Sequence, residues 1–147
     1  MSNAKTIAYI LGAIAVIAIV WAFFDHKKME IQFAGANNPL YIFKNNELKE
    51  IKGDKMPFAI HERMENFTNH TFQVEKGDLL YMFSDGYEDQ FGRPLGKKFM
   101  SKALKQLIVS VGNLTMNEQK EGIERKFEAW KGDLDQMDDV LMIGVKI

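Results

Sequence analysis

Two apolar runs, each next to acidic residues, dominate the hydrophobic pattern of the second half of the chain. Residues 79–83 are all apolar and are followed by Ser-Asp-Gly, which predicts a strand buried on both faces that ends in a turn carrying Asp85. Near the C-terminus the order is reversed, because Asp138 and Asp139 precede the apolar run 140–143. If the two strands are antiparallel neighbours in one sheet, Asp85 lies beside Asp138 at the edge of that sheet.

The N-terminal region is compatible with two structures. Residues 6–24 contain no charged side chain, and a helix of that length would rise roughly 28 Å, enough to cross a bilayer. Residues 17–24 are also rich in branched and aromatic side chains, and residues 29–34 alternate with period two after a polar turn, as in a β-hairpin. We keep both alternatives: a membrane anchor over residues 6–24, or a core strand over residues 17–24.

The domain is therefore predicted to span residues 17–147. Residues 1–16 form a separate apolar segment, and its first four residues resemble a remnant of cloning. Within the domain, residues 40–43 and 47–51 flank a Lys-Asn-Asn turn and predict a hairpin. Residues 66–74 alternate loosely and predict one more strand before the buried one.

Two helices are predicted between the buried strand and the last one. Over residues 95–111, apolar side chains recur every fourth residue from Phe99 to Val111, as on one face of a helix. A second helix begins after Thr115, with Glu118 three positions later, which is the spacing of a capping box. Strands grouped before and after a pair of helices predict an α+β fold, in which an antiparallel β-sheet layer packs against two helices.

Composition and charge narrow the classes of function. The 147 residues suffice for one domain, and the formal net charge of −1 gives no electrostatic reason to expect a nucleic-acid partner. The chain has no cysteine, which excludes disulfides and thiolate metal sites. Its three histidines, His26, His61 and His70, have no spacing typical of metal ligands.

The remaining candidate chemistry is carboxylate chemistry. Ser84 lacks the Gly-x-Ser-x-Gly surroundings of a nucleophile, so we interpret it as a structural hydroxyl in a turn. Two carboxylates that converge at a sheet edge, Asp85 and Asp138, would form half of a site for a hard divalent cation such as magnesium or manganese.

Three segments of the chain carry a family resemblance. Residues 34–39 are Ala-Gly-Ala-Asn-Asn-Pro, residues 77–92 run from Gly-Asp through the apolar strand to Ser-Asp-Gly and on to Gln-Phe-Gly, and residues 136–140 are Gln-Met-Asp-Asp-Val. In this order they resemble the metal-dependent serine/threonine protein phosphatases, in their bacterial SpoIIE-like branch. The resemblance covers roughly residues 17–147.

The resemblance implies a fold, an activity and a cofactor. The sheet and the two helices would be part of an α-β-β-α sandwich. The activity would be hydrolysis of phosphoserine or phosphothreonine on a regulatory signalling protein, with magnesium or manganese as the cofactor. By this resemblance, Asp85 and Asp138 would hold the same metal ion.

Four further residues receive roles from the resemblance alone. Asp139 would not bind the metal directly; it would support the metal ligands or start the last strand. Gly86 would lie next to the metal ligands or on the substrate side. Asn37 and Asn38 would lie near the substrate side of the sheet.

One segment of the family pattern has no counterpart in the sequence. The family's first metal-binding segment, an Asp followed by Gly-His-Gly, should precede the strand at 17–24, and nothing there matches it. That Asp bridges two metals in the family, so this chain offers two carboxylates for a single ion. We therefore expect the chain alone to be inactive; the alternative is a non-catalytic pseudophosphatase or interaction module.

Location and assembly are expected from the same features. The chain is expected to be cytoplasmic or, if residues 6–24 span a membrane, anchored with its phosphatase portion in the cytoplasm. A sheet covered on one side only would expose an apolar face, which predicts a homodimer or a strand-exchanged oligomer.

Overall fold

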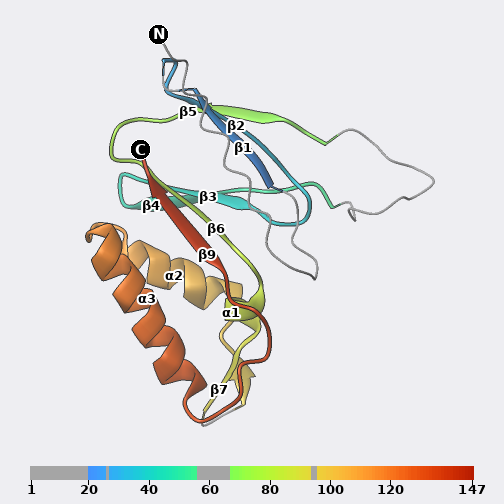
Figure 1. Cartoon of the computed structure of the whole chain (residues 1–147), viewed down its shortest axis with the longest axis vertical. Helices are drawn as coiled ribbons and strands as arrows, with labels where there is room; N and C mark the ends of the chain where they lie inside the picture. The colour runs from blue at the N-terminus through green and yellow to red at the C-terminus, as the bar shows by residue number, and fades with distance from the viewer. Residues whose placement is uncertain (1–19, 26, 56–66, 94–95) are drawn as a thin grey trace, which may run out of the picture. The chain divides into compact units, whose positions relative to one another are not determined.

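The chain divides into two compact units, each built on its own antiparallel sheet (Figure 1). The structure is a computed structural model that describes residues 20–25, 27–55, 67–93 and 96–147. Of the described residues, those numbered up to 40 and from 51 to 76 form one unit, and those numbered 41–50 and from 77 to 147 form the other. Antiparallel sheets combined with helices confirm the predicted α+β class.

The first unit contains a sheet of three strands in the order β1-β2-β5. These strands are β1 (Val20–Asp25), β2 (Glu30–Gly35) and β5 (His70–Gln73). In β2, Ile31 and Phe33 are buried and alternate with half-buried Glu30, Gln32 and Ala34, as the period-two pattern predicts.

The β1–β2 hairpin distinguishes the two N-terminal alternatives for the six residues of β1 only. Every residue of β1 is paired with β2, from Val20 opposite Gly35 to Asp25 opposite Glu30. A membrane-spanning helix that continues to residue 24 is therefore wrong, because this backbone is engaged in a sheet. Residues 1–19, which hold the rest of the predicted anchor, lie outside the described residues. In the part of the chain that is described, no helix has the length and apolarity needed to cross a membrane.

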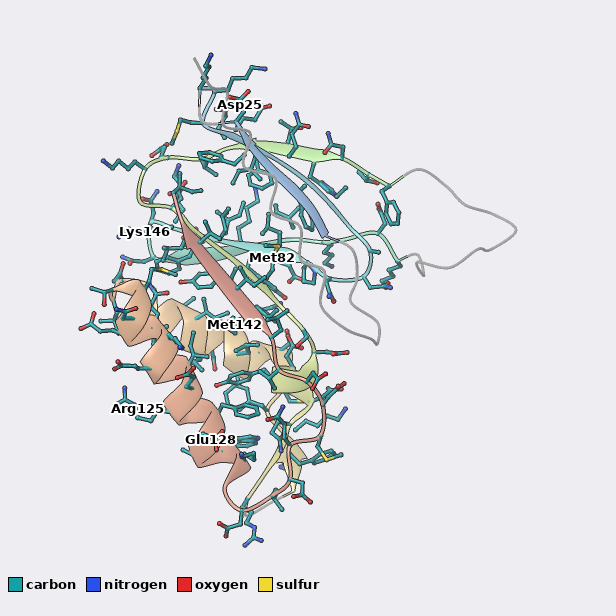
Figure 2. All side chains as sticks on the ribbon, in the orientation of Figure 1. Asp25, Met82, Arg125, Glu128, Met142 and Lys146 are labelled. Atoms are coloured by element: carbon teal, nitrogen blue, oxygen red, sulfur yellow. The ribbon has the colours of Figure 1, made fainter. Side chains whose placement is uncertain are left out.

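The second unit contains a sheet of four strands in the order β4-β3-β6-β9. These strands are β3 (Leu40–Lys44), β4 (Glu47–Ile51), β6 (Leu79–Phe83) and β9 (Met142–Lys146). Only the end residues Leu40 and Ile51 are grouped with the first unit. β6 pairs with β3 on one side and with β9 on the other, both antiparallel, so the predicted pairing of the two acid-flanked strands is confirmed. Met142 and Lys146 mark the two ends of β9 in Figure 2.

Three helices and a short hairpin complete this unit. They are α1 (Gly86–Asp89), β7 (Phe91–Gly92) paired with β8 (Lys97–Lys98), α2 (Ser101–Val111) and α3 (Met116–Lys131). One buried apolar cluster joins the sheet to the two long helices; its members include Tyr81, Phe83, Leu104, Ile108 and Phe127. The predicted layer of antiparallel sheet with two packed helices is therefore present in this unit.

Some element boundaries differ from the sequence prediction. The helix predicted from residue 95 begins at Ser101, because Phe99 and Met100 donate backbone hydrogen bonds to the carbonyls of Gln90 and Glu88 instead of entering the helix. The strand predicted over 66–74 is confined to His70–Gln73 among the described residues.

The N-terminus of α3 has the predicted capping box. The Thr115 hydroxyl accepts a hydrogen bond from the Glu118 backbone amide at 3.3 Å, and the Glu118 carboxylate accepts one from the Thr115 amide at 2.8 Å. The Glu118 carboxylate also accepts a hydrogen bond from the Thr115 hydroxyl at 2.7 Å. This bond contributes most, and the bond from the Thr115 amide next, to holding the pKa of Glu118 below its ordinary value. The reciprocal bonds satisfy amides that the helix leaves without internal partners.

Replacing Thr115 with alanine is expected to lower the free energy of unfolding by about 1 kcal/mol, because the cap bond is lost. Urea denaturation followed by circular dichroism measures the change. Ser110→Ala is the matched control, since that hydroxyl only donates back to the Leu107 carbonyl within α2 and its loss should be close to neutral. An equal loss in both variants would contradict the assignment of the cap.

Candidate functional site

The carboxylate of Asp85 stands at the junction between β6 and α1. β6 is buried except for half-buried Met82, and the exposed Asp85 follows one residue after Ser84. Asp85 occupies the N-cap position of α1, and the Asp89 amide donates to its carbonyl at 2.9 Å. Its carboxylate caps none of the amides of α1, all of whose residues are described. The side chain is therefore available to a ligand.

Asp138 and Asp139 belong to the exposed segment between α3 and β9. The Asp138 carboxylate accepts a hydrogen bond from the Asp139 amide at 2.7 Å, and its carbonyl accepts one from the Gln136 side chain at 2.8 Å. β9 begins at Met142, later than the predicted residue 140. The ladder stops there because the Leu141 amide donates to the Ser84 hydroxyl instead of to a strand partner.

Ser84 links the Asp85 turn to the segment that contains Asp138 and Asp139 by hydrogen bonds. Its hydroxyl donates to the Asp139 carbonyl at 2.9 Å and accepts from the Leu141 amide at 3.0 Å, while its own amide donates to the Leu141 carbonyl at 2.9 Å. These bonds extend the register in which Phe83 faces Met142. The interpretation of Ser84 as a structural hydroxyl agrees with these contacts, although the sequence did not show which segment it would hold.

Gly86 brings the backbones of the two segments into direct contact. A Cβ atom at this position would collide with the carbonyl group of Asp139 and would lie 3.4 Å from the carbonyl carbon of Asp138. Gly86 is buried, whereas Asp85, Asp138 and Asp139 are exposed. Gly86 therefore packs against the carbonyl group of Asp139 and close to that of Asp138, which brings the segments of the predicted ligands together.

Charged groups near α1 add to the negative character of this edge. Burial raises the pKa of Glu88, and Asp85 is among the carboxylates that raise it further, while a hydrogen bond with Ser101 and the charge of Lys105 oppose the shift. The Lys105 ammonium lies 2.6 Å from a Glu50 carboxylate oxygen, a bond that raises the pKa of Lys105. The ammonium group of Lys105 is thus paired with Glu50, and that of Lys98 is paired with Asp89 of α1 at 3.0 Å.

Asn37 and Asn38 lie in the first unit, in the turn after β2. Asn37 has a left-handed backbone with φ of 63°, and its amide donates to the Asp54 carbonyl at 2.8 Å. The Asn38 amide donates to the Ala36 carbonyl at 2.7 Å, and the Asp54 amide donates to the Gly35 carbonyl at 2.7 Å. These bonds define the turn; a place on the substrate side stays a prediction for both residues.

The donor set at the β6–β9 edge suits a hard cation. Carboxylate oxygens are the ligands that Mg²⁺ and Mn²⁺ prefer, and the close approach at Gly86 brings two acid-bearing segments together. Asp85 and Asp138 are the side chains that would hold such an ion. Over residues 20–25, 27–55, 67–93 and 96–147, no group of three or more His, Cys, Asp or Glu side chains is placed to bind a metal.

Comparison with known families gives one match over nearly the whole chain. Residues 5–147 match the family described as Stage II sporulation protein E (SpoIIE). No curated protein matches the sequence.

Solved structures share the fold. The SiaA-PP2C domain of Pseudomonas aeruginosa superposes with a TM-score of 0.78 at 23% identity, over 87% of this chain and 50% of that one. A structure with the PP2C phosphatase domain and a regulatory fragment of SpoIIE from Bacillus subtilis gives 0.69 at 18% identity, over 88% of this chain and 37% of that one. The RsbU and RsbW domains of Rv1364c from Mycobacterium tuberculosis give 0.64 at 17% identity, over 88% and 35%. This chain spans half or less of each structure.

Proposed function

Because the chain belongs to the SpoIIE family and has a fold shared with PP2C phosphatase domains, we propose that it carries the second and closing metal-binding segments of a metal-dependent protein phosphatase. The substrate class is phosphoserine or phosphothreonine on a signalling protein. The carboxylates of Asp85 and Asp138 hold one Mg²⁺ or Mn²⁺ ion.

The approach of the two acidic segments at Gly86 is the observation that carries this proposal. The register of β6 and β9, the two bonds of the Ser84 hydroxyl and the packing of Gly86 bring the Asp85 turn and the Asp138–Asp139 peptide to the same end of the two strands. An Asp-Gly turn alone is common at strand ends, but two acidic segments held together this tightly are not needed to end a strand.

The residues of the site bind and orient, and the cation supplies the electrophilic chemistry. When bound, a divalent ion polarises phosphoryl oxygens and lowers the pKa of water, which removes the need for a protein nucleophile. Asp85 and Asp138 bring negative charge to the ion, and Gly86 leaves space for the two segments to meet. Ser84 has both of its hydroxyl interactions directed at the backbone of residues 139 and 141, so it is not assigned a nucleophilic role.

The number of ligands favours a second candidate function for the isolated chain. Mg²⁺ holds weakly with two protein carboxylates unless a phosphate joins them, and the described residues bring no third acid or histidine into one group with them. The chain by itself is then a pseudophosphatase or interaction module that retains the fold. Both candidates share the metal-binding edge but differ in turnover.

Metal titration tests the proposal. We expect the chain to bind one Mn²⁺ in a calorimetric titration, and we expect Asp85→Asn and Asp138→Asn each to abolish that binding, because each removes a charged ligand. Asp133→Asn is the matched control: this carboxylate lies in the same acidic segment, is 90% exposed and pairs with Arg93 at 3.8 Å. Unchanged binding in Asp85→Asn would refute the site.

An assay of the same proteins on an aryl phosphate separates the two candidates. Mn²⁺-dependent turnover that disappears in Asp85→Asn supports the enzyme. Absence of turnover in a folded chain that binds Mn²⁺ supports the interaction module.

The partners are proposed on the same basis. A phosphoprotein is the expected substrate, and self-association as a homodimer or by strand exchange is proposed through β9. This strand is at the edge of its sheet, and Val145 within it and Leu141 beside it are each 42% exposed. Unpaired strand edges of this kind recruit further strands. A cytoplasmic location is proposed because a phosphoprotein substrate of a signalling pathway is expected there.

A further inference from the structure

Gln90 is a fully buried polar side chain placed directly after α1, with an exposed fraction of 0%. Its amide nitrogen donates to the carbonyls of Asp135 and Phe91, both at 3.0 Å, and its amide oxygen accepts from the Met137 backbone amide at 3.1 Å. Two of these three bonds therefore reach the segment that precedes β9. A buried amide with its bonds satisfied fixes its surroundings, since breaking it would leave polar groups without partners.

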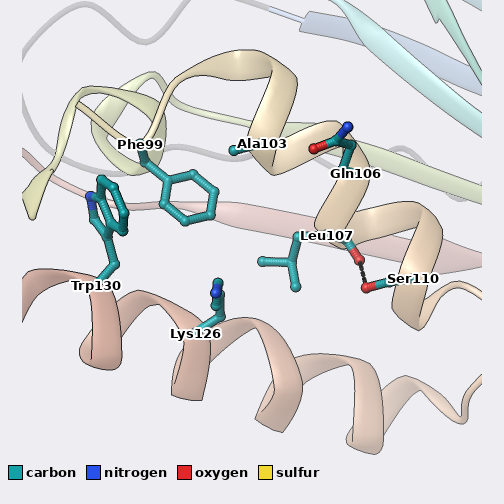
Figure 3. A pocket seen from close by; sticks show the side chains of 7 residues that line it. All are labelled: Phe99, Ala103, Gln106, Leu107, Ser110, Lys126 and Trp130. Carbon is teal, nitrogen blue, oxygen red and sulfur yellow. Dashed lines mark hydrogen bonds between the residues drawn. The ribbon is translucent and has the colours of Figure 1, made fainter. Parts of the chain in front are cut away.

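The backbone of Gln90 is fixed as firmly as its side chain. Its carbonyl accepts hydrogen bonds from the Trp130 indole and from the Phe99 amide, both at 3.0 Å. The ring centroids of these two residues lie 5.4 Å apart in an edge-to-face arrangement. Figure 3 shows the two rings at one end of the pocket between α2 and α3. Gln90 is thus attached to α3 and to the start of α2 before it contacts the acidic segment.

Asp138 lies between two points of attachment. Gln90 holds residues 135 and 137 on one side of it, and Ser84 holds residues 139 and 141 on the other. Residues 135–139 are all exposed, so little apolar packing contributes to their position. Gln90 is also joined to Asp85 through the single turn of α1.

We propose that Gln90 is a positioning residue, which holds residues 135–137 and so keeps Asp138 beside Asp85. The effect of Gln90 on cation binding rests on the proposed function. The attachment of residues 135–137 to Gln90 is independent of that function. Neither the family match nor the sequence pattern assigned Gln90 a role.

A second buried glutamine provides the matched control. Gln119 is 2% exposed, and its amide donates to the carbonyls of Gly112 at 3.3 Å and Leu114 at 2.9 Å, while its oxygen accepts from the Tyr81 hydroxyl. These bonds join the α2–α3 turn to β6. Replacing Gln119 removes as many buried hydrogen bonds as replacing Gln90 but touches no residue of the acidic segment.

Hydrogen exchange of the whole chain tests the attachment. In Gln90→Met, which keeps the length of the side chain but not its bonds, the Met137 amide is expected to exchange roughly tenfold faster relative to the amides of β6, as for the loss of one ordinary hydrogen bond. Gln119→Met should leave that ratio unchanged. Equal acceleration over the whole unit in both variants would overturn the proposal, because Gln90 would then act only on global stability.

In Gln90→Glu, protection of the Met137 amide should depend on pH, which an effect on global stability alone does not predict. A protonated carboxyl group can donate to the Asp135 carbonyl and accept from the Met137 amide. A carboxylate can only accept, and one of its oxygens would face the Asp135 and Phe91 carbonyl oxygens with no proton between them, which would push residues 135–137 away. Burial favours the protonated form, so the protection of Met137 in this variant is expected to return as the pH falls. The wild-type chain should show no such change in its ratio of exchange rates, and failure of acid to restore protection would count against the proposal.

Mn²⁺ titration of the same variants separates this inference from the proposed function. If both hold, Gln90→Met binds Mn²⁺ about 10- to 100-fold more weakly, the usual cost of losing a group that orients a ligand, and Gln119→Met binds it normally. Wild-type affinity in a Gln90→Met protein whose segment has opened would overturn the role in placing Asp138. If the wild-type chain binds no Mn²⁺, the metal site fails, and the exchange ratios alone decide whether Gln90 holds the segment.

Discussion

Leu104→Ala is expected to lower the free energy of unfolding by about 2–5 kcal/mol, the range for truncating a leucine in a packed core. Leu104 is completely buried in α2 and belongs to the apolar cluster that joins this helix to the four-stranded sheet. Truncation removes buried apolar surface and leaves a cavity that a sheet and two helices cannot close without shifting. Denaturation by urea, monitored by circular dichroism, measures the loss.

The control for this prediction is Leu114→Ala, which makes the same change at a residue that is 46% exposed in the α2–α3 connection. Its effect should stay within about 0.5 kcal/mol, as for most surface substitutions. If Leu104→Ala were equally mild, α2 would not be packed on the sheet as described. The assignment of Tyr81 and Phe83 to a core shared with this helix would then also fail.

Local patterns in the sequence were sufficient to predict several elements of the second unit. The strand β6 follows from five apolar residues that end at an Asp-Gly turn, and the start of α3 follows from the spacing of Thr115 and Glu118. The pairing of β6 with β9 follows from the reversed order of acidic and apolar residues. The first two signals each lie within a few residues, whereas the pairing joins distant segments and depended on the two acid-flanked strands being neighbours.

The predictions failed where distant contacts decide the structure. Phe99 keeps the fourfold spacing of the helix that follows, yet its amide bonds to the Gln90 carbonyl, and the helix begins only at Ser101. The N-terminal run was ambiguous because hydropathy does not distinguish a buried strand from a membrane helix, and only its pairing with β2 shows that Val20–Asp25 is a strand.

The sequence was sufficient to predict the carboxylates of the candidate site but not the residue that positions them. Asp85 and Asp138 stand out as carboxylates at strand ends, whereas Gln90 looks like an ordinary loop residue. Its role depends on partners 45 and 47 positions later in the chain. A possible signal was an uncharged amide between a strand end and an aromatic residue, but that pattern is also common on protein surfaces.

Gly86→Ala is expected to be the most damaging single-methyl addition at the site, lowering the free energy of unfolding by about 3 kcal/mol, the upper part of the range for overpacking. Gly86 is the first residue of α1, and its helical backbone suits alanine as well as glycine, so only space forbids the change. The added Cβ would meet the carbonyl group of Asp139, and a backbone group cannot move aside as a flexible side chain can.

Gly122→Ala makes the same substitution with the opposite expected sign. Gly122 lies inside α3, where a Cβ would be 3.4 Å from a Val111 methyl group, an ordinary contact. Alanine there should raise the free energy of unfolding by up to about 1 kcal/mol, because glycine is a poor helix former. Urea denaturation of both variants, with a Mn²⁺ titration of each, measures the contrast.

The pair of glycine variants therefore tests the approach of the two acidic segments directly. Gly86→Ala should also weaken Mn²⁺ binding, because the Asp85 turn and the Asp139 carbonyl group must separate to admit the methyl group. Gly122→Ala should bind Mn²⁺ as the wild-type chain does, since the added Cβ would contact a Val111 methyl group and no residue of the acidic segments. If Gly86→Ala were as stable as the wild-type protein, the two segments would not be in contact, and the basis for placing both carboxylates on one cation would be lost.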